Sequence, residues 1–176
     1  MQTVLRALRL YAMVAWVGGL IFFAFVVAPV AFHSLASAHQ AGLVVGGTLR
    51  VLHLIGLVGG VVFYAATSLL WFRAEVPARV SFAIQLVLTG VMLAVTAYSQ
   101  FRILPAMEHD RAVTGGEIET ASLENVGRVD FERLHVLSER LEGFVLLCGL
   151  GVVYVLSRES QWPETGKPKT DRIVRP

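Results

Sequence analysis

Four long apolar segments separated by polar ones dominate the chain. They comprise residues 10–32, 51–72, 80–101 and 143–157. Each of the first three is 22 or 23 residues long without an acid, lysine or arginine, enough to cross a hydrocarbon core of about 30 Å as a helix. The fourth has only 15 residues, so its span must begin near Leu141 and bring Glu142 to the membrane edge. Because the runs are continuous rather than alternating, they predict an all-α integral membrane bundle of four transmembrane helices, not a β-barrel.

The first segment has two interpretations. Ala36-Ser37-Ala38 after it resembles a signal-peptidase site. However, the apolar part of a secretory signal is about 7–15 residues long, and this segment is longer. We therefore expect an uncleaved transmembrane helix, with cleavage as the alternative.

The polar segments set the expected organisation. Residues 73–79 predict a tight turn, and Thr114-Gly115-Gly116 predicts a turn within a longer polar loop at about residues 105–130. Asp130 is the expected N-cap of the fourth helix. We thus expect one transmembrane domain over residues 1–157. Residues 158–176 predict a polar, disordered cytoplasmic tail.

Composition narrows the class of protein further. Hydrophobic residues make up 55% of the chain and charged residues only 16%, whereas soluble domains average about 25% charged residues. The net charge is +2, and no Lys/Arg cluster is interleaved with aromatic residues, which argues against nucleic-acid binding. Cys148 is the sole cysteine, so no intrachain disulfide can form, and we expect it to be a small packing residue.

The distribution of basic residues predicts the orientation. With the N-terminus in the cytoplasm, nine of the 15 Lys and Arg residues fall on the cytoplasmic side and six outside. The positive-inside rule therefore favours both termini in the cytoplasm, and we expect a bacterial cytoplasmic membrane. In this orientation all five histidines lie on the outer side.

Several short motifs follow one another along the chain. The first helix carries Trp16-Val17-Gly18-Gly19-Leu20, followed by a run to Pro29 and Phe32. Ala41-Gly42, Ile103-Leu104-Pro105 and the segment Phe131 to Ser138 come after it. In this order the motifs resemble the transmembrane protein 205-like family, over about residues 8–157. The resemblance implies a four-helix membrane domain whose biochemical role is largely unassigned. Glu142 departs from the pattern, in which a neutral polar residue such as Asn is expected.

The histidines are the most suggestive chemical set. Imidazole suits copper, zinc, iron and nickel, and transmembrane histidine pairs can hold haem, which makes His33, His53, His109 and His135 candidate metal ligands. No HxxxH or HExxH spacing is present, and interfacial histidines are ordinarily half-solvated groups. The sequence also has no GxSxG, no phosphate-binding loop and no paired buried carboxylates, so it does not decide whether the protein is an enzyme.

A polar stripe enters the fourth helix. At about 100° per residue, His135, Ser138 and Glu142 share one face, and they are candidate cofactor- or ligand-binding residues. An ionisable group in a membrane segment is costly and suggests a site. The partners expected for Glu142 are His135, Arg102 or Arg50. In the alternative interpretation, Glu142 only reaches the outer interface.

Gly18-Gly19 and the pair Gly56 and Gly60 allow close helix packing. This packing is either within the bundle or between copies in a homo-oligomer.

Beyond membrane lipid, the expected partner is a small solute or a metal ion. The leading hypothesis is a non-enzymatic carrier or accessory protein acting at the outer face, with no cofactor. The alternative is a membrane redox enzyme with a His-ligated metal or haem. Five polar residues of the third helix could line a path: Gln85, Thr89, Thr96, Ser99 and Gln100.

Overall fold

The structure, a computed structural model, describes residues 2–74, 76–114, 118, 121–122 and 124–159, without the side chains of residues 76–78. All regular structure in these residues is helical, which confirms the all-α prediction. Four continuous helical segments are long and apolar enough to cross a membrane. The elements are α1 (Gln2–Phe22), η1 (Phe23–Val27), α2 (Ala28–Ser34), α3 (Ala38–Trp71), α4 (Val76–Tyr98), η2 (Ser99–Ile103), α5 (Leu104–Val113) and α6 (Val126–Glu159).

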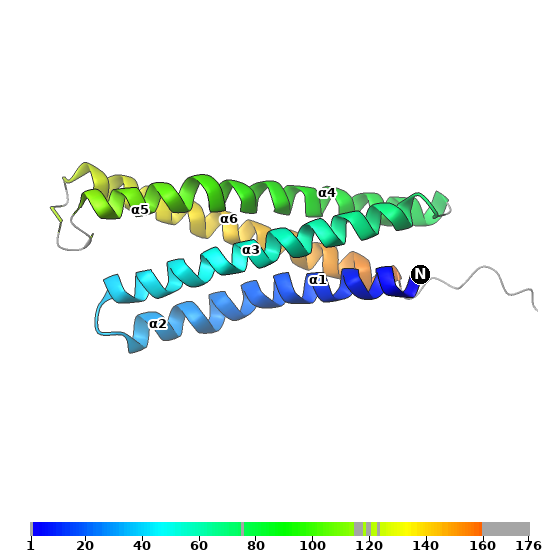
Figure 1. Cartoon of the computed structure of the whole chain (residues 1–176), viewed down its shortest axis with the longest axis horizontal. Coiled ribbons are helices and arrows are strands. Elements are labelled where there is room, and N and C mark those ends of the chain that lie inside the picture. Colours follow the sequence, from blue (N-terminus) through cyan, green and yellow to red (C-terminus); the bar gives the residue numbers. More distant parts are fainter. Residues whose placement is uncertain (1, 75, 115–117, 119–120, 123, 160–176) are drawn as a thin grey trace, which may run out of the picture.

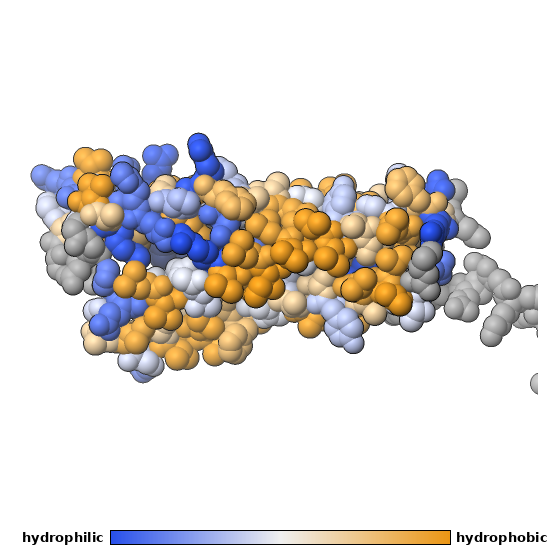
Figure 2. All heavy atoms as spheres, in the orientation of Figure 1, coloured by the Kyte–Doolittle hydropathy of each residue, from blue (hydrophilic) through white to orange (hydrophobic). Residues whose placement is uncertain are grey.

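The four segments run antiparallel along an elongated bundle (Figure 1). We call the end at which α1 and α4 begin and α3 and α6 end the terminal end. The opposite end, where α2 and α5 end and α3 and α6 begin, is the loop end. The main packing is of α3 against α1 and α4, and of α4 against α6. A hydrophobic band covers the middle of the visible face, whereas hydrophilic residues gather at the loop end (Figure 2), as a membrane-spanning bundle requires.

The loop predicted at about residues 105–130 is shorter than expected. Its first part is helical, because α5 continues the third crossing to Val113, and α6 already begins at Val126. A helix that leaves the membrane keeps its backbone hydrogen bonds, so loss of hydropathy does not end it. The apolar run therefore marked the membrane-embedded part of each helix and not the helix itself. The expected turn at Gly115 and Gly116 and the expected disordered tail from residue 160 lie outside the described residues.

The expected N-cap of the fourth helix was wrong. Asp130 lies inside α6, and the side chain of Asn125 accepts hydrogen bonds from the amides of Gly127 and Arg128 instead. Asn is as good an N-cap as Asp, and the cap belongs where the helix starts rather than where the apolar run starts. Ser37 caps α3 in the same way by accepting from the amide of Gln40 at 3.2 Å.

Two π-helical turns, η1 and η2, interrupt the first and third crossings, and each is followed by a proline. Pro29 lies in the first turn of α2 and Pro105 in the first turn of α5. Proline lacks the amide hydrogen that would continue the helical ladder. The wider turns accommodate this loss, with the amide of Ala28 bonding to the carbonyl of Phe23 and that of Leu104 to the carbonyl of Ser99. The helices thus continue through both prolines.

The core of the bundle is built around Trp16 of α1. Its indole lies directly over Gly56 and Gly60 of α3, and a Cβ at either glycine would collide with the ring. Met13, Phe63 and Met92 fill the same layer and are fully buried. The Gly56 and Gly60 pair therefore packs within the bundle, where glycine lets a large ring approach the helix backbone.

At the loop end the bundle separates into two helix pairs. There α2 packs against α3 and α5 packs against α6, whereas in the described residues no comparable backbone packing joins α2 or α3 to α5 or α6. The pairs are visible as two layers that diverge toward the loop end (Figure 1). This separation leaves room for a cavity inside the bundle.

Candidate functional site

A cavity of about 830 Å³ fills the wedge between the two helix pairs at the loop end. Ligand sites of drug-sized molecules occupy about 300–1,000 Å³. One wall is apolar and comes from α1, η1, α2 and α3, including Leu20, Phe23 and Phe32. The other wall comes from α5 and α6 and carries most of the charge. An apolar wall facing a few polar groups is the usual composition of a small-molecule site.

Glu142 lies deep in this cavity and is bound to a buried histidine. Its Oε1 is 2.6 Å from Nε2 of His53, which is 1% exposed. The other ring nitrogen, Nδ1, lies 3.1 Å from Oε1 of Gln100. His53 thus joins α3 to η2 and α6 through one side chain.

The second carboxylate oxygen of Glu142, Oε2, is buried and has no hydrogen-bond partner within the protein. A carboxylate offers about four acceptor positions. An unfilled acceptor on a buried charged group is costly, and the side chain lines the cavity. The side chain as a whole is 15% exposed, so a rotation that turns Oε2 toward the cavity lets Glu142 accept a hydrogen bond or a positive charge from a molecule there.

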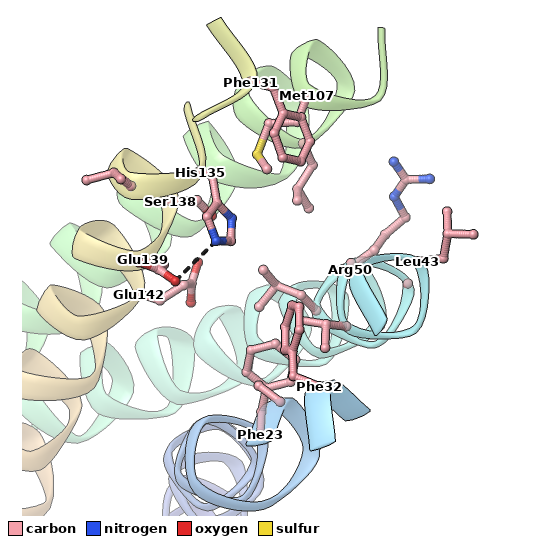
Figure 3. Close-up of a pocket in the computed structure, with 18 of the residues that line it drawn as sticks. Phe23, Phe32, Leu43, Arg50, Met107, Phe131, His135, Ser138, Glu139 and Glu142 are labelled. Atoms are coloured by element: carbon pink, nitrogen blue, oxygen red, sulfur yellow. Dashed lines mark ion pairs between the residues drawn. The ribbon is translucent and has the colours of Figure 1, made fainter. Parts of the chain in front are cut away.

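The three stripe residues predicted on the fourth helix all line the cavity (Figure 3). Ser138 is buried, whereas His135 is half-exposed and pairs with Glu139 at 3.2 Å. Its ring also stacks on Phe131 at 6.1 Å between centroids. The partners expected for Glu142 were wrong, because its partner is His53 and not His135, Arg102 or Arg50. Helical periodicity gives the face of one helix but not the helix that packs against it.

The mouth of the cavity is ringed by charges from both walls. Arg50 of α3 pairs with Glu108 of α5 across the opening at 2.6 Å, and both side chains are largely exposed. Arg111 lies over the ring of Phe131 at 5.2 Å. Four acids line the cavity against two arginines, namely Glu108, Glu132, Glu139 and Glu142 against Arg50 and Arg111. This balance favours a cationic or hydrogen-bond-donating head group.

The structure does not bring the predicted metal ligands together. His33 and His109 are exposed on α2 and α5, His53 is committed to Glu142 and Gln100, and His135 is paired with Glu139. In the described part of the chain, no three His, Cys, Asp or Glu residues form a group that could hold a metal ion. His53 is also not the half-solvated interfacial group expected, because it lies in the middle of a helix longer than the apolar run indicated.

Sequence analysis missed a second polar centre, at the terminal end. Arg9 of α1 is fully buried and contacts Glu159 of α6 through two nitrogens, both at 3.2 Å. Gln85 of α4 hydrogen-bonds to both Arg9 and Glu159. The guanidinium also lies over the rings of Phe63 and Phe82, at 5.3 and 5.1 Å. This Arg9 cluster joins all four crossings at one point.

Periodicity could have revealed both centres. On α3, His53, Gly56, Gly60 and Thr67 recur at helical spacing, and so do Arg9, Met13 and Trp16 on α1. Each charged or polar residue continues a stripe of small or bulky core residues, which indicates an inward face. Hydropathy alone placed Arg9 outside the membrane helix, because a charged residue lowers the hydropathy and is taken as the end of the apolar segment.

These features define the class of protein: a polytopic helical membrane protein with a small-molecule-sized cavity open at one end and a buried ion pair at the other. A model of the family described as "Domain of unknown function (DUF4149)" matches residues 11–112. The chain belongs to this family. The match includes His53 and Gln100 but ends before α6, so Glu142 lies outside it. No curated protein and no solved structure matches the chain.

Proposed function

We propose that the protein binds a small amphiphilic solute with an ammonium or similar donor head group in the loop-end cavity, as a carrier or accessory rather than as an enzyme. The observation that carries this proposal is the free Oε2 of Glu142 at the floor of a largely apolar cavity. An apolar tail fits between Leu20, Phe23 and Phe32. The head group donates to Glu142, which His53 holds in place.

Three expectations from the sequence complete the proposal. The cavity opens on the outer side of a bacterial cytoplasmic membrane with both termini in the cytoplasm, as the distribution of basic residues favours. The motifs around Trp16 and His135 support kinship with the transmembrane protein 205-like family. The alternative of a His-ligated redox centre gains no support from the separated positions of His33, His109 and His135.

The test is calorimetry on the protein in lipid nanodiscs with hexylammonium, hexanol and hexanoate, using empty nanodiscs as the blank. Hexylammonium is expected to bind at least tenfold more tightly than hexanol, and hexanoate to bind least. Glu142→Gln should weaken hexylammonium binding about tenfold or more while leaving hexanol unchanged, since it removes the charge and keeps the shape.

Glu124→Gln is the matched control, because it makes the same change on an exposed side chain that does not line the cavity. It should alter hexylammonium affinity less than twofold, because water screens the lost charge. Equal affinity for the three probes, or equal effects of the two substitutions, would refute the proposal. Counterflow of hexylguanidinium, which keeps both its charge and its N–H donors, in proteoliposomes then separates a carrier, which exchanges the solute, from an accessory protein, which only holds it.

A further inference from the structure

The buried polar atoms that lack partners lie along one line through the bundle. In the described residues, six buried side-chain N or O atoms have no hydrogen-bond partner: Arg9 Nε, Thr67 Oγ1, Thr89 Oγ1, Thr96 Oγ1, Ser99 Oγ and Glu142 Oε2. They come from all four crossings, and three of them, the hydroxyls of Thr89, Thr96 and Ser99, share one buried face of α4 and η2 between Arg9 and Glu142. Unpaired polar groups are rare in protein interiors and costlier in a membrane. Three on one helix face between two ionic centres indicate a common purpose.

The line follows one buried face of α4 and η2 between two hydrogen-bonded ends. Glu159 and Arg9 hydrogen-bond to Gln85, and Thr89 lies one turn further along α4. Thr96 and Ser99 follow on the same buried face. Gln100 then contacts His53, and His53 contacts Glu142. Gln100 lies 15 positions beyond Gln85, which is about 22 Å at the helical rise, most of a hydrocarbon core.

The lining of this track suits protons better than larger ions. Apart from Arg9, which only donates, the lining consists of hydroxyls, amides, an imidazole and carboxylates, all of which can both receive and release a hydrogen bond or a proton in at least one form. Thr89 and Thr96 are 0% and 1% exposed, so a hydrated metal ion has no open path along this face. Intramembrane ionisable residues joined in this way mark proton relays in pumps and transporters.

One section of the track is dry. Thr96 lies seven positions, about two turns, beyond Thr89, and the fully buried Met92 lies on the same face between them. The methyl group of Met92 faces Gly149 of α6, where a Cβ would come within 3.2 Å of it. Methionine is flexible at three torsions, so its movement can admit or exclude the water that joins the two polar halves.

We propose that the α4 face from Gln85 to Gln100, together with Thr67, is a hydrated proton track that connects Glu142 at the loop-end cavity with Glu159 at the terminal end. A proton taken up at one carboxylate displaces one along the hydroxyls and water molecules, and one is released at the other carboxylate. The chain regains its starting protonation, so no oxidant or co-reactant is consumed. Proton movement does not depend on solute binding and goes beyond the proposed function.

The test uses full-length protein in liposomes loaded with pyranine, a pH-sensitive dye, with a potassium gradient and valinomycin to set the membrane potential. Wild type should acidify the lumen at least fivefold faster than protein-free liposomes. The double substitution Thr89→Val and Thr96→Val keeps the shape, removes two hydroxyls and should abolish at least four fifths of this flux. Met92→Thr adds a hydroxyl in the dry section and should raise the flux at least twofold.

Thr48→Val is the matched control, since its hydroxyl bonds to the carbonyl of Val44 at 2.8 Å and lies off the track. It should leave the flux unchanged. Thermal unfolding in detergent reports whether the double variant has folded. A wild-type flux equal to that of protein-free liposomes overturns the proposal. So does a flux unaffected by both the double substitution and Met92→Thr. Either result leaves the solute-binding proposal intact.

Discussion

Arg9 occupies a site in which a positive charge has no access to water. Its guanidinium is enclosed by Glu159, Gln85 and two phenyl rings, and the side chain is fully buried. Arginine stays charged under all ordinary conditions, so its stability in this position depends on Glu159. Glu159 is 20% exposed, so it depends on its partner less.

This asymmetry predicts the order of effects in a double-mutant cycle. Glu159→Gln leaves a buried cation without a counter-charge and should lower the free energy of unfolding by roughly 3 kcal/mol or more. Arg9→Met should cost less, because Glu159 retains contact with water. The double substitution should be more stable than Glu159→Gln alone. Equilibrium unfolding in mixed SDS micelles measures all three.

Arg6→Met is the control for this cycle, because Arg6 is exposed on the same helix. It should change the free energy of unfolding by less than about 0.5 kcal/mol. If Glu159→Gln is no more harmful than Arg6→Met, the Arg9 cluster does not stabilise the bundle.

The sequence predicts side chains such as Glu142 but not their partners. A carboxylate at the start of an apolar run is conspicuous, and the helical stripe with Ser138 correctly places it on an inner face. Its partner His53 lies 89 residues away, and no rule of spacing pairs residues on separate helices. Arg9 was missed for a different reason, because a charge next to an apolar run looks like the end of a span until its burial is known.

At the scale of elements, the contact between α1 and α3 depends on glycine. Trp16 occupies the space that side chains at Gly56 and Gly60 would need. The four apolar runs predicted the number of helices, and this was confirmed. They did not predict the ends of α5 and α6, because hydropathy reports the membrane and not the backbone hydrogen bonds that carry a helix beyond it.

Gly56→Ala should therefore destabilise the bundle by about 1–3 kcal/mol, because the added methyl group forces the indole of Trp16 to move. Gly18→Ala is the control, since no atom lies within 4 Å of its added Cβ. It should be neutral or stabilising by up to about 1 kcal/mol, because alanine favours helix. Thermal unfolding in detergent, with oligomeric state followed by light scattering, measures both. A Gly56→Ala variant that unfolds as wild type but changes oligomeric state would instead place Gly56 at a contact between copies.

At the scale of the whole molecule, the two ends differ in construction. The Arg9 cluster closes the terminal end, whereas the loop end separates into two helix pairs around a cavity. Orientation therefore decides from which side of the membrane the cavity can be filled. The sequence provides only the distribution of basic residues for this decision.

Cysteine labelling in intact cells measures the orientation. In a Cys148→Ser background, a cysteine at Ser122, an exposed residue of the loop end, should react with a membrane-impermeant maleimide. A cysteine at Thr165 should react only after the cells are permeabilised. The reverse pattern would place the cavity mouth in the cytoplasm and overturn the proposed outer binding site.

The two π turns affect how related sequences should be aligned. A π turn accommodates one residue more than the α-helical ladder, and one residue corresponds to a rotation of about 100°. Phe32 lies beyond η1 and Met107 lies beyond η2, and both line the cavity. The helical repeat that turns them toward the cavity is therefore shifted by one residue from the repeat of α1 and α4. Loss of one residue from residues 23–27 alone would turn one wall away from the other. Gaps at residues 23–27 and 99–103 are thus expected to occur together among relatives that keep the cavity, and a relative with a single gap has lost one of its walls.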